Sequence, residues 1–519
     1  MDNINRISIE ANSSRQIKSG AVISYLAIAF KIIAGLIYTP WMVRQIGQAD
    51  YGLFTLAVSV ISFFALDFGL GLAVSRFLSY YRAKNDKEGA KRFLGIAYKL
   101  FITISVIIFI VLAVVYLLIE NIYVKLTPDE ISKLKVLFVI AGLFTVVSFS
   151  FRPLDGILIA NERFVFCKLV GLLHKVFVVV LMVGALLLGY GLYALVIVNA
   201  FVGLAIIAGK FIYVKRATDT EIDFTGHDRT LLKDIFGFSV WITVIVVAQR
   251  FILNITPTIL GAFAGSVQIA LFSVGMTIEG YTWTISNAIG GLFLPKVARM
   301  TVKNSDMREI ENLMIKVGRL QLLIVGLVII GFAAMGKEFM VLWMGKNFLP
   351  SYYVAVLLIA PGIISWTQEI GNTTLVALNK IKYSAIASIT TAFVSIILSI
   401  ILSRTYGAIG AATGIFFGYI VGFIVAMNMV YYKVLKVDVF RFFRECHLKM
   451  LIPLLMAFAI GLFMQRFFPV ENMCLFMVKA GIFCVIYFLL MWGLALNAFE
   501  KGLFADLFRK MYHILGRKH

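Results

Sequence analysis

The sequence predicts an all-α polytopic membrane protein with about fourteen transmembrane helices, on three observations. Of the 519 residues, 61% are hydrophobic and only 14% are charged, whereas soluble globular chains are near 45–50% apolar and about 25% charged. Apolar runs of roughly 20 residues, enough to cross about 30 Å of hydrocarbon as a helix, recur along the whole chain. Basic residues concentrate in alternate connecting segments, as expected of a multi-pass protein.

The apolar runs define the expected helices in chain order. Their approximate limits are 20–43, 51–80, 93–118, 136–159, 169–189, 192–213, 235–260, 268–295, 318–336, 352–378, 383–403, 408–431, 450–466 and 475–497. The run 450–466 is short and carries Pro453. The run 235–260 contains Arg250, Asn254 and Pro257, so we expect this helix to be bent or broken.

The distribution of positive charge predicts the orientation. If the N-terminus is cytoplasmic, the inner segments carry 31 of the 48 Lys and Arg residues and the outer segments carry eight. This split supports an even number of spans with both termini in the cytoplasm. It also accounts for most of the net charge of +21, so no nucleic-acid partner is expected.

Three short matches at a nearly constant spacing indicate an internal repeat. GILIANERF (156–164) matches TLVALNKIK (374–382), with Asn161 on Asn379, and DYGLF (50–54) matches QIALF (268–272), both with a shift of 218. YGLYALVIVNAFVG (190–203) matches YGAIGAATGIFFGY (406–419) with a shift of 216. Six predicted spans separate the copies, so they share one orientation.

The repeat predicts two parallel six-helix lobes around a central cavity, a common transporter plan. The expected parts are an N-terminal lobe (1–213, spans 1–6), a cytoplasmic linker (214–234), a C-terminal lobe (235–431, spans 7–12) and two further helices with a cytoplasmic tail (432–519).

Nine basic residues fall in or near the predicted spans. Those near span ends, Lys210, Arg319 and Lys479, are expected to extend toward the headgroups. A charge at a helix centre costs ~2.5–3.5 kcal/mol, so the deeper residues should face a wet cavity or a partner. These deeper residues are Lys31, Lys99, Arg152, Lys175 and Arg250. A shift of 218 places Lys31 on Gln249, beside Arg250, so both lobes carry a cation at a similar depth.

The acidic residues of the predicted spans are Asp67, Asp155, Glu279 and Glu369. Arg152 and Asp155 are three residues apart on one helix and could neutralise each other, which leaves a structural pair and a ligand-binding arginine equally open. Asp67, Glu279 and Glu369 are interpreted either as sites of ion coupling or as permanent counter-ions. The small excess of deep cations suggests an anionic ligand.

Enzymatic motifs are missing from the sequence. GFAAMGKE (331–338) has the spacing of a P-loop, but Glu338 replaces the Ser or Thr that should hold magnesium. The five histidines do not cluster, and the four cysteines form no CxxC pair. We therefore expect no enzyme, no catalytic residues, no metal site and no cofactor, and an ion gradient, the membrane potential or the substrate gradient would drive any transport.

The first two spans carry a recognisable pattern. Pro40 ends the first span, a G-x-x-x-YG link follows at 47–52, and DFGLG with a later SR pair lies in the second span. LIANERF follows the fourth span, and YG with a later GAA precedes the twelfth. These features resemble bacterial Wzx-type polysaccharide flippases of the multidrug/oligosaccharidyl-lipid/polysaccharide (MOP) exporter superfamily.

The resemblance implies transport of an undecaprenyl-diphosphate-linked oligosaccharide, such as an O-antigen unit for lipopolysaccharide, between the leaflets of the bacterial inner membrane. The deep cations would bind the diphosphate, and Arg76 matches the motif arginine near the inner end of the second span, where it would act in initial capture. Asp67, Glu279 and Glu369 would couple transport to H⁺ or Na⁺, as in an antiporter. The implied partners are the lipid-linked substrate, the membrane and glycan-assembly proteins such as a polymerase.

Two alternative functions stay open on the sequence alone. A cation-coupled small-molecule or drug exporter of the same superfamily predicts a net acidic cavity. A membrane glycan polymerase or glycosyltransferase predicts a carboxylate-rich active site and a large outer loop.

Overall fold

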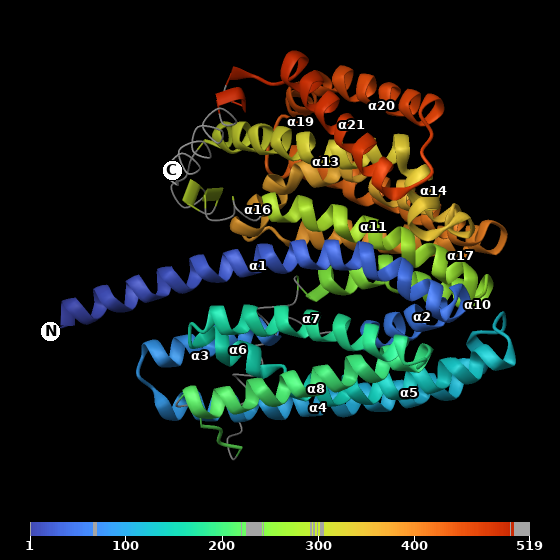
Figure 1. Cartoon of the computed structure of the whole chain (residues 1–519). Helices are drawn as coiled ribbons and strands as arrows, with labels where there is room; N and C mark the ends of the chain where they lie inside the picture. The colour runs from blue at the N-terminus through green and yellow to red at the C-terminus, as the bar shows by residue number, and fades with distance from the viewer. Residues whose placement is uncertain are drawn as a thin grey trace, which may run out of the picture. The chain divides into compact units, whose positions relative to one another are not determined.

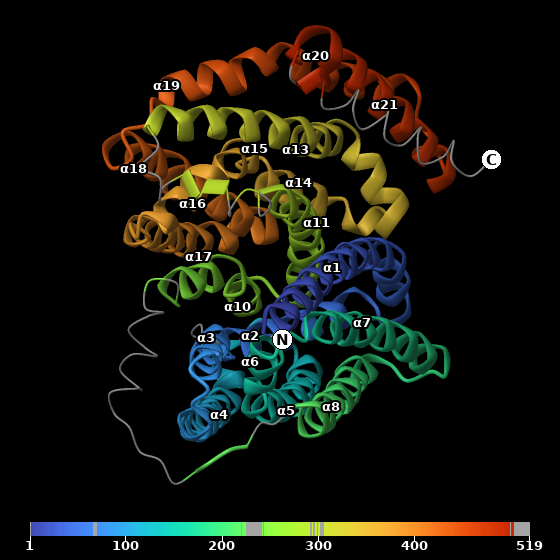
Figure 2. The same cartoon turned by 90° about the vertical axis from the view of Figure 1, so that its left-hand side faces the viewer.

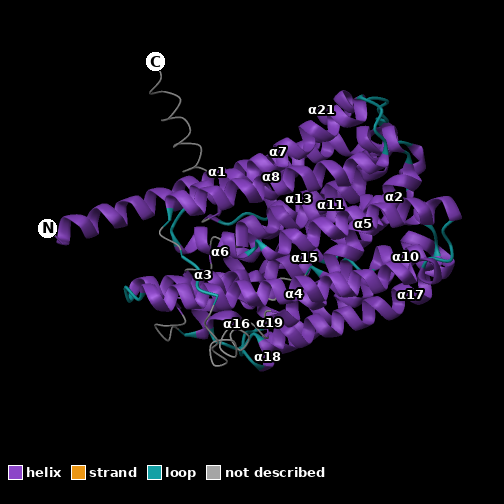
Figure 3. Cartoon of the chain, turned by 90° about the horizontal axis from the view of Figure 1, so that it is seen from below, coloured by secondary structure: helices purple, strands orange, loops and turns teal. Residues whose placement is uncertain are grey.

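The computed structural model describes residues 2–65, 70–218, 221–224, 241, 243–290, 293, 296–297, 299–300, 306–498 and 500–502. Helices dominate this part of the chain, and no strand occurs in it (Figure 3). Among the described residues, eleven helical stretches are long and apolar enough to cross a membrane. The predicted all-α membrane fold is confirmed.

Helices lie over each of the fourteen predicted spans, so the predicted count is compatible with the structure. The span 51–80 corresponds to α2 (Gln48–Phe64) and α3 (Leu70–Ala83), and 268–295 corresponds to α11 (Ser266–Gly290). The stretch Lys382–Lys433 covers two predicted spans. It bends at Gly407, whose φ of 53° lies in the left-handed region that glycine tolerates.

The helices group into two compact units, Met1–Ser273 with Ser403–Gly407 (unit 1) and Val274–Leu402 with Ala408–His519 (unit 2). The lobe limits derived from the sequence stay a prediction. Besides α2 and α3, unit 1 contains α1 (Asp2–Ile46), α4 (Lys87–Ile122), α5 (Pro128–Ser150), α6 (Pro153–Ala160), α7 (Phe164–Leu187), α8 (Leu192–Ala217) and α10 (Thr256–Phe263).

Unit 1 is a helix bundle in which α1 packs along α7, α4 along α5, and α3 along α6 (Figure 1). Local signals start several helices. Thr127 and Glu130 form a capping box at the start of α5, and the Asp86 carboxylate accepts a hydrogen bond from Gly89 N (2.8 Å) to cap α4. The predicted break in 235–260 is confirmed, because the helix ending near Asn254 is followed by α10 with Pro257 in its first turn.

Unit 2 is organised around α13 (Met307–Met344), which contacts most of the other helices of the unit (Figure 2). Besides α13 and most of α11, the unit contains α14 (Pro350–Ile359), α15 (Gly362–Ser365), α16 (Glu369–Ala377), α17 (Lys382–Tyr419), α18 (Met427–Lys433), α19 (Val439–Phe442), α20 (Lys449–Phe467) and α21 (Met473–Leu494). Short 3-10 helices cover Lys346–Phe348 and Trp366–Gln368, and π-helices cover Ile420–Ala426 and Phe443–Leu448.

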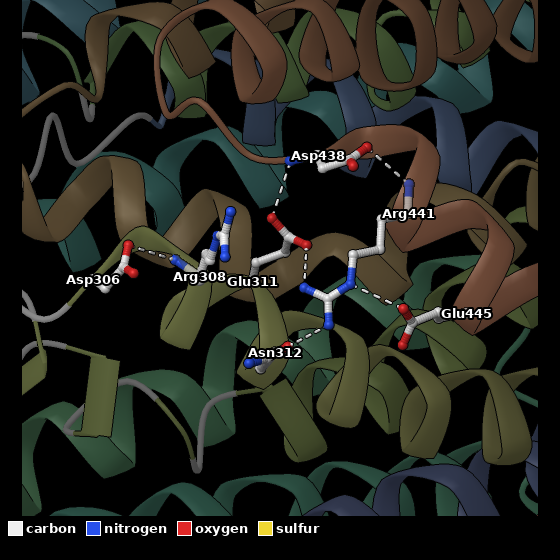
Figure 4. A network of polar contacts seen from close by, with 7 residues as sticks. All are labelled: Asp306, Arg308, Glu311, Asn312, Asp438, Arg441 and Glu445. Atoms are coloured by element: carbon white, nitrogen blue, oxygen red, sulfur yellow. Dashed lines mark hydrogen bonds and ion pairs between the residues drawn. The ribbon is translucent and has the colours of Figure 1, made fainter.

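A polar network fastens α19 to the start of α13 (Figure 4). The Arg441 guanidinium donates to Glu311 (2.6 Å), Asn312 (2.7 Å) and Glu445 (2.9 Å). The Glu311 carboxylate also accepts a hydrogen bond from Asp438 N at 3.1 Å. Because Arg441 spreads its donors over three acceptors, the connection to the last two helices is held at a fixed place on α13.

Two buried ion pairs hold the last two helices and the following segment against α13. Arg319 pairs with Glu500 at 2.5 Å, and Lys479 pairs with Glu338 at 2.5 Å. Arg319 and Lys479 are 4% and 5% exposed. The prediction that these two side chains extend toward the headgroups is therefore wrong, because a buried carboxylate neutralises each of them inside the protein.

The backbone supports the internal repeat. Gly47 and Gly265, which lie 218 residues apart, have φ values of 90° and 91°. The turns before DYGLF and QIALF thus take the same left-handed conformation in both copies.

The Lys479–Glu338 pair yields a stability prediction. Glu338→Gln keeps an acceptor for Val470 N, which donates to Glu338 at 2.6 Å, but leaves the Lys479 charge buried without its counter-ion. We expect a loss of about 3–5 kcal/mol, measured as a lower thermal-denaturation midpoint of the purified protein in detergent.

The double variant Glu338→Gln, Lys479→Met removes both charges and should recover most of that loss. Glu120→Ala is the control, because it breaks the ion pair of Glu120 with Lys135, in which the Glu120 side chain is 65% exposed. This variant should lose about 1 kcal/mol of stability or less. Equal midpoints for Glu338→Gln and Glu120→Ala would contradict this account.

Candidate functional site

Two of the cations predicted to lie deep in the membrane are carried by α1 and α7, which pack against each other. The Tyr38 hydroxyl of α1 donates a hydrogen bond to Met182 Sδ of α7 at 3.2 Å. Seven residues earlier on each helix lie Lys31 and Lys175. Two turns of parallel helices preserve the register, so these lysines occupy facing positions two turns along the α1–α7 contact, and the Lys31 charge acts on Lys175. Both side chains are exposed.

A second pair of like charges lies in the same unit. Arg152 occupies the break between α5 and α6, with its guanidinium 4.8 Å from the Phe149 ring centre. Its charge acts on Arg250, which lies four residues before Asn254 at the break that precedes α10. Both arginines are half-buried. Helix breaks thus position one pair, and helix packing positions the other.

Within the described residues, no carboxylate lies within 4.0 Å of Lys31, Lys175 or Arg250. Charges inside membrane spans normally pair or face a water-filled cavity. Like charges held near one another also repel, and an anion bound between them relieves that repulsion. Lys31, Lys175 and Arg250 are therefore candidates for binding an anion.

The other predicted residues of unit 1 have different surroundings. Asp155 forms an ion pair with Lys210 at 2.6 Å, so the lysine expected to extend toward the headgroups instead has a partner on α6. Lys99 is half-buried on α4, and Arg76 is exposed on α3, 6.0 Å from the Phe77 ring centre. Asp67 lies outside the described residues.

The two acids predicted for the second half lie in unit 2. Glu279 is 6% exposed on α11, and Glu369 begins α16. Beside Glu369, the Gln368 amide donates to Asn428 Oδ1 at 2.7 Å. Sequence reasoning missed this amide pair because Gln368 and Asn428 carry no charge, although polar residues in apolar runs were a usable signal.

Direct backbone contact joins the first turns of α2 and α11 within unit 1. A Cβ added at Gly52 would overlap the carbonyl of Ser266 and lie 3.4 Å from Ala270 N. The repeat aligns DYGLF with QIALF, so Gly52 and Ala270 are equivalent positions of the two copies. The two copies of the repeat therefore approach each other at equivalent positions.

Polar contacts extend this junction. Ser266 Oγ donates to Glu130 at 2.5 Å, and Asn254 Nδ2 donates to Ser62 Oγ at 2.8 Å. We call the set Gly52, Ser62, Glu130, Asn254 and Ser266 the seam. Both α2 and α11 begin at predicted outer loops.

Part of the predicted linker docks on α4. Asp223 N donates to Lys91 O at 3.2 Å, and the Asp223 carbonyl occupies the place where a Cβ of Gly95 would lie. The Lys91 ammonium forms an ion pair with Glu221 at 2.5 Å. This hydrogen bond from Lys91, with its positive charge, holds the pKa of the exposed Glu221 carboxyl below its usual value.

The family follows from the sequence of the first 300 residues. The family model described as "Polysaccharide biosynthesis protein" matches residues 17–300. The chain belongs to this polysaccharide biosynthesis protein family. The family resemblance predicted from the sequence is thereby confirmed. None of the curated proteins compared with the chain matches it significantly.

Solved structures identify the fold. The lipid II flippase MurJ in an inward closed conformation superposes with a TM-score of 0.66 at 16% identity, covering 91% of this chain and 97% of that one. An inward-facing multidrug resistance MATE family transporter of the MOP superfamily gives 0.63 at 16% identity, over 80% and 99%. A MOP superfamily transporter from Pyrococcus furiosus Vc1 gives 0.57 at 16%, over 82% and 97%. The chain thus has the MOP transporter fold.

The seam predicts an intolerance to side chains at Gly52. In a variant without the four native cysteines, Ser62→Cys with Asn254→Cys should cross-link readily, because these side chains touch. Adding Gly52→Leu should lower the cross-linking yield several-fold, since the backbones can no longer meet. Gly171→Leu is the matched control, because nothing lies within 4 Å of a Cβ there. Equal cross-linking yields in the Gly52→Leu and Gly171→Leu variants would contradict the close backbone approach at the seam.

The linker contact predicts a pH response. A carboxyl with a lowered pKa in the folded state stabilises that state above its unfolded pKa, and this contribution is lost as pH falls through the lowered value. Hydrogen exchange of the Asp223 amide, corrected for intrinsic rates, should therefore speed up on acidification. In Glu221→Gln, the Asp223 amide should already exchange fast at neutral pH and should speed up little on acidification. If this variant kept the pH dependence of the wild-type protein, the result would argue against the contact.

Proposed function

We propose that the protein is a flippase that moves an undecaprenyl-diphosphate-linked oligosaccharide from the inner to the outer leaflet by alternating access. The observation that carries this proposal is the set of two cation pairs, Lys31 with Lys175 and Arg152 with Arg250, inside the membrane-spanning part of unit 1. Membership of a polysaccharide biosynthesis family supports a glycan cargo.

The diphosphate is the part of such a substrate that hydrocarbon cannot solvate. Cations in a low-dielectric pocket attract it more strongly than cations in water. Arginine can hold phosphate oxygens with two parallel hydrogen bonds, while lysine acts as a point charge. The half-buried Arg152 and Arg250 would therefore orient the diphosphate, and the exposed Lys31 and Lys175 would attract it.

The remaining assignments form part of the same proposal. The substrate-binding set is completed by Lys99 and by Arg76 as the capture residue. Glu279, Glu369 and Asp67 are the candidates for coupling to H⁺ or Na⁺. The protein would act without catalysis in the bacterial inner membrane, with cytoplasmic termini and with glycan-assembly proteins as partners.

The test is translocation of a fluorescent polyisoprenyl-diphosphate oligosaccharide in proteoliposomes, read by quencher accessibility. Each of Lys31→Ala, Arg152→Ala and Arg250→Ala removes one charge-assisted contact of ~1.5–3 kcal/mol, so the rate should fall between about tenfold and about a hundredfold. Lys31→Arg keeps the charge and should retain most of the activity.

Lys346→Ala provides the matched control, since this exposed lysine lies in a predicted outer loop. Wild-type rates in all three alanine variants would refute the cationic site. Transport of organic cations, abolished by Glu279→Gln or Glu369→Gln while the alanine variants stay active, would favour the exporter alternative.

A further inference from the structure

A polar pocket of about 490 Å³ lies at the predicted inner end of unit 1. The end of α3, the start of α4 and the residue after α6 form its walls, and the docked part of the predicted linker contributes Glu221. Three basic side chains line the pocket, namely Arg82, Lys87 and Lys91. Its volume is in the range of small-molecule sites, and none of the cations assigned above to substrate binding lines it.

The charges of the pocket belong to different parts of the chain. Its cations lie on α3 and α4, whereas Glu221 lies on the linker. Lys91 forms an ion pair with Glu221 at 2.5 Å, and the Lys87 charge also acts on this carboxylate. Lys91 has a second partner in Glu88 at 3.2 Å. The other carboxylate of the pocket wall, Asp86, caps α4. Glu221 is therefore the one pocket carboxylate that can leave without disturbing a helix.

Arg82 and Lys87 give the pocket an excess of positive charge. Arg82 Nη1 donates a hydrogen bond to Ala160 O at 2.9 Å. Among the described residues, neither Arg82 nor Lys87 has a carboxylate within 4.0 Å. Both side chains are exposed, so an ion from solution can reach them. Guanidinium and ammonium groups beside the amides of Asn85 and Asn161 are suitable donors for phosphate oxygens.

The equivalent joint of unit 2 is more firmly closed. There, the segment after the twelfth predicted span docks on the start of α13, much as the linker after the sixth span docks on α4. Arg441 holds that joint through three acceptors, and one of them, Glu311, is 5% exposed. In unit 1 the corresponding charge pair is Glu221 with Lys91, and the Glu221 side chain is 70% exposed. Exposed ion pairs contribute little to stability, so a competing anion can replace Glu221.

We propose that this pocket binds a phosphate group, of a soluble compound or of a lipid headgroup, in place of the Glu221 carboxylate, and that binding releases the linker from α4. A diphosphate carries more charge and more acceptor oxygens than one carboxylate, so it gains more from three neighbouring cations. The linker backbone leaves with Glu221, because Asp223 rests between Lys91 O and Gly95 of α4. The inference does not depend on the transported cargo proposed above.

The experiment titrates the full-length protein in neutral detergent with inorganic pyrophosphate and follows hydrogen exchange of the Asp223 amide. Sodium chloride at the same ionic strength is the reference, because salt alone screens the exposed Lys91–Glu221 pair. Pyrophosphate should bind saturably and speed up exchange several-fold over this reference.

A second arm distinguishes the two sources of phosphate. The protein is placed in vesicles of phosphatidylcholine with or without phosphatidylglycerol, and exchange of the same amide is measured. Faster exchange with phosphatidylglycerol, but not with pyrophosphate, would identify a lipid headgroup as the ligand, and the converse a soluble phosphate compound. No response to either anion would overturn the proposal.

Variants, compared in the arm that responds, separate the pocket from general charge attraction. Arg82→Gln and Lys87→Gln each remove a pocket cation and should weaken anion binding by about threefold or more. Lys84→Gln is the matched control, because this exposed lysine lies in the α3–α4 turn but does not line the pocket. Glu221→Gln removes the tethered competitor and should tighten binding by about threefold.

Equal weakening in Lys84→Gln and Lys87→Gln would overturn the proposal, and so would an unchanged affinity in Glu221→Gln. Lys87→Gln decides the question even if loss of the hydrogen bond to Ala160 unfolds Arg82→Gln. It removes a positive charge from the first turn of α4, where the helix dipole disfavours cations, so this variant should fold.

Discussion

The cost of placing a charge in hydrocarbon governs the arrangement of polar side chains along this chain. In unit 2, Arg319 and Lys479 are buried and each is neutralised by a carboxylate, so these charges serve to hold helices together. In unit 1, Lys31, Lys175 and Arg250 have no such carboxylate among the described residues. The same physical penalty thus explains the buried ion pairs of unit 2, and it is the reason that we propose an anionic ligand for the cations of unit 1.

The geometry of unit 1 explains why its cations come in pairs. Parallel packing of α1 on α7 repeats every seven residues and brings Lys31 to Lys175, while the helix breaks before α6 and α10 bring Arg152 within electrostatic range of Arg250. Both arrangements depend on the backbone, namely on the packing of α1 against α7 and on the helix breaks before α6 and α10.

The sequence allowed the membrane fold, the repeat and the break near Pro257 to be predicted, because apolar length, periodic spacing and proline are local signals. It also identified the deep cations. It did not reveal that the helix carrying Lys31 packs against the helix carrying Lys175, since that depends on the register of two helices whose contacting residues are 144 positions apart. The partners of Arg319 and Lys479 lie 181 and 141 residues away, so charge depth alone led to the wrong expectation.

The packing of Gly52 against Ser266 constrains how the two repeat copies can diverge. When a segment is duplicated, its copies normally become free to accumulate substitutions independently. A side chain at position 52 would overlap the Ser266 carbonyl and approach Ala270 N, the equivalent position in the other copy. Substitution at position 52 is therefore limited by the backbone of the segment that duplicates it.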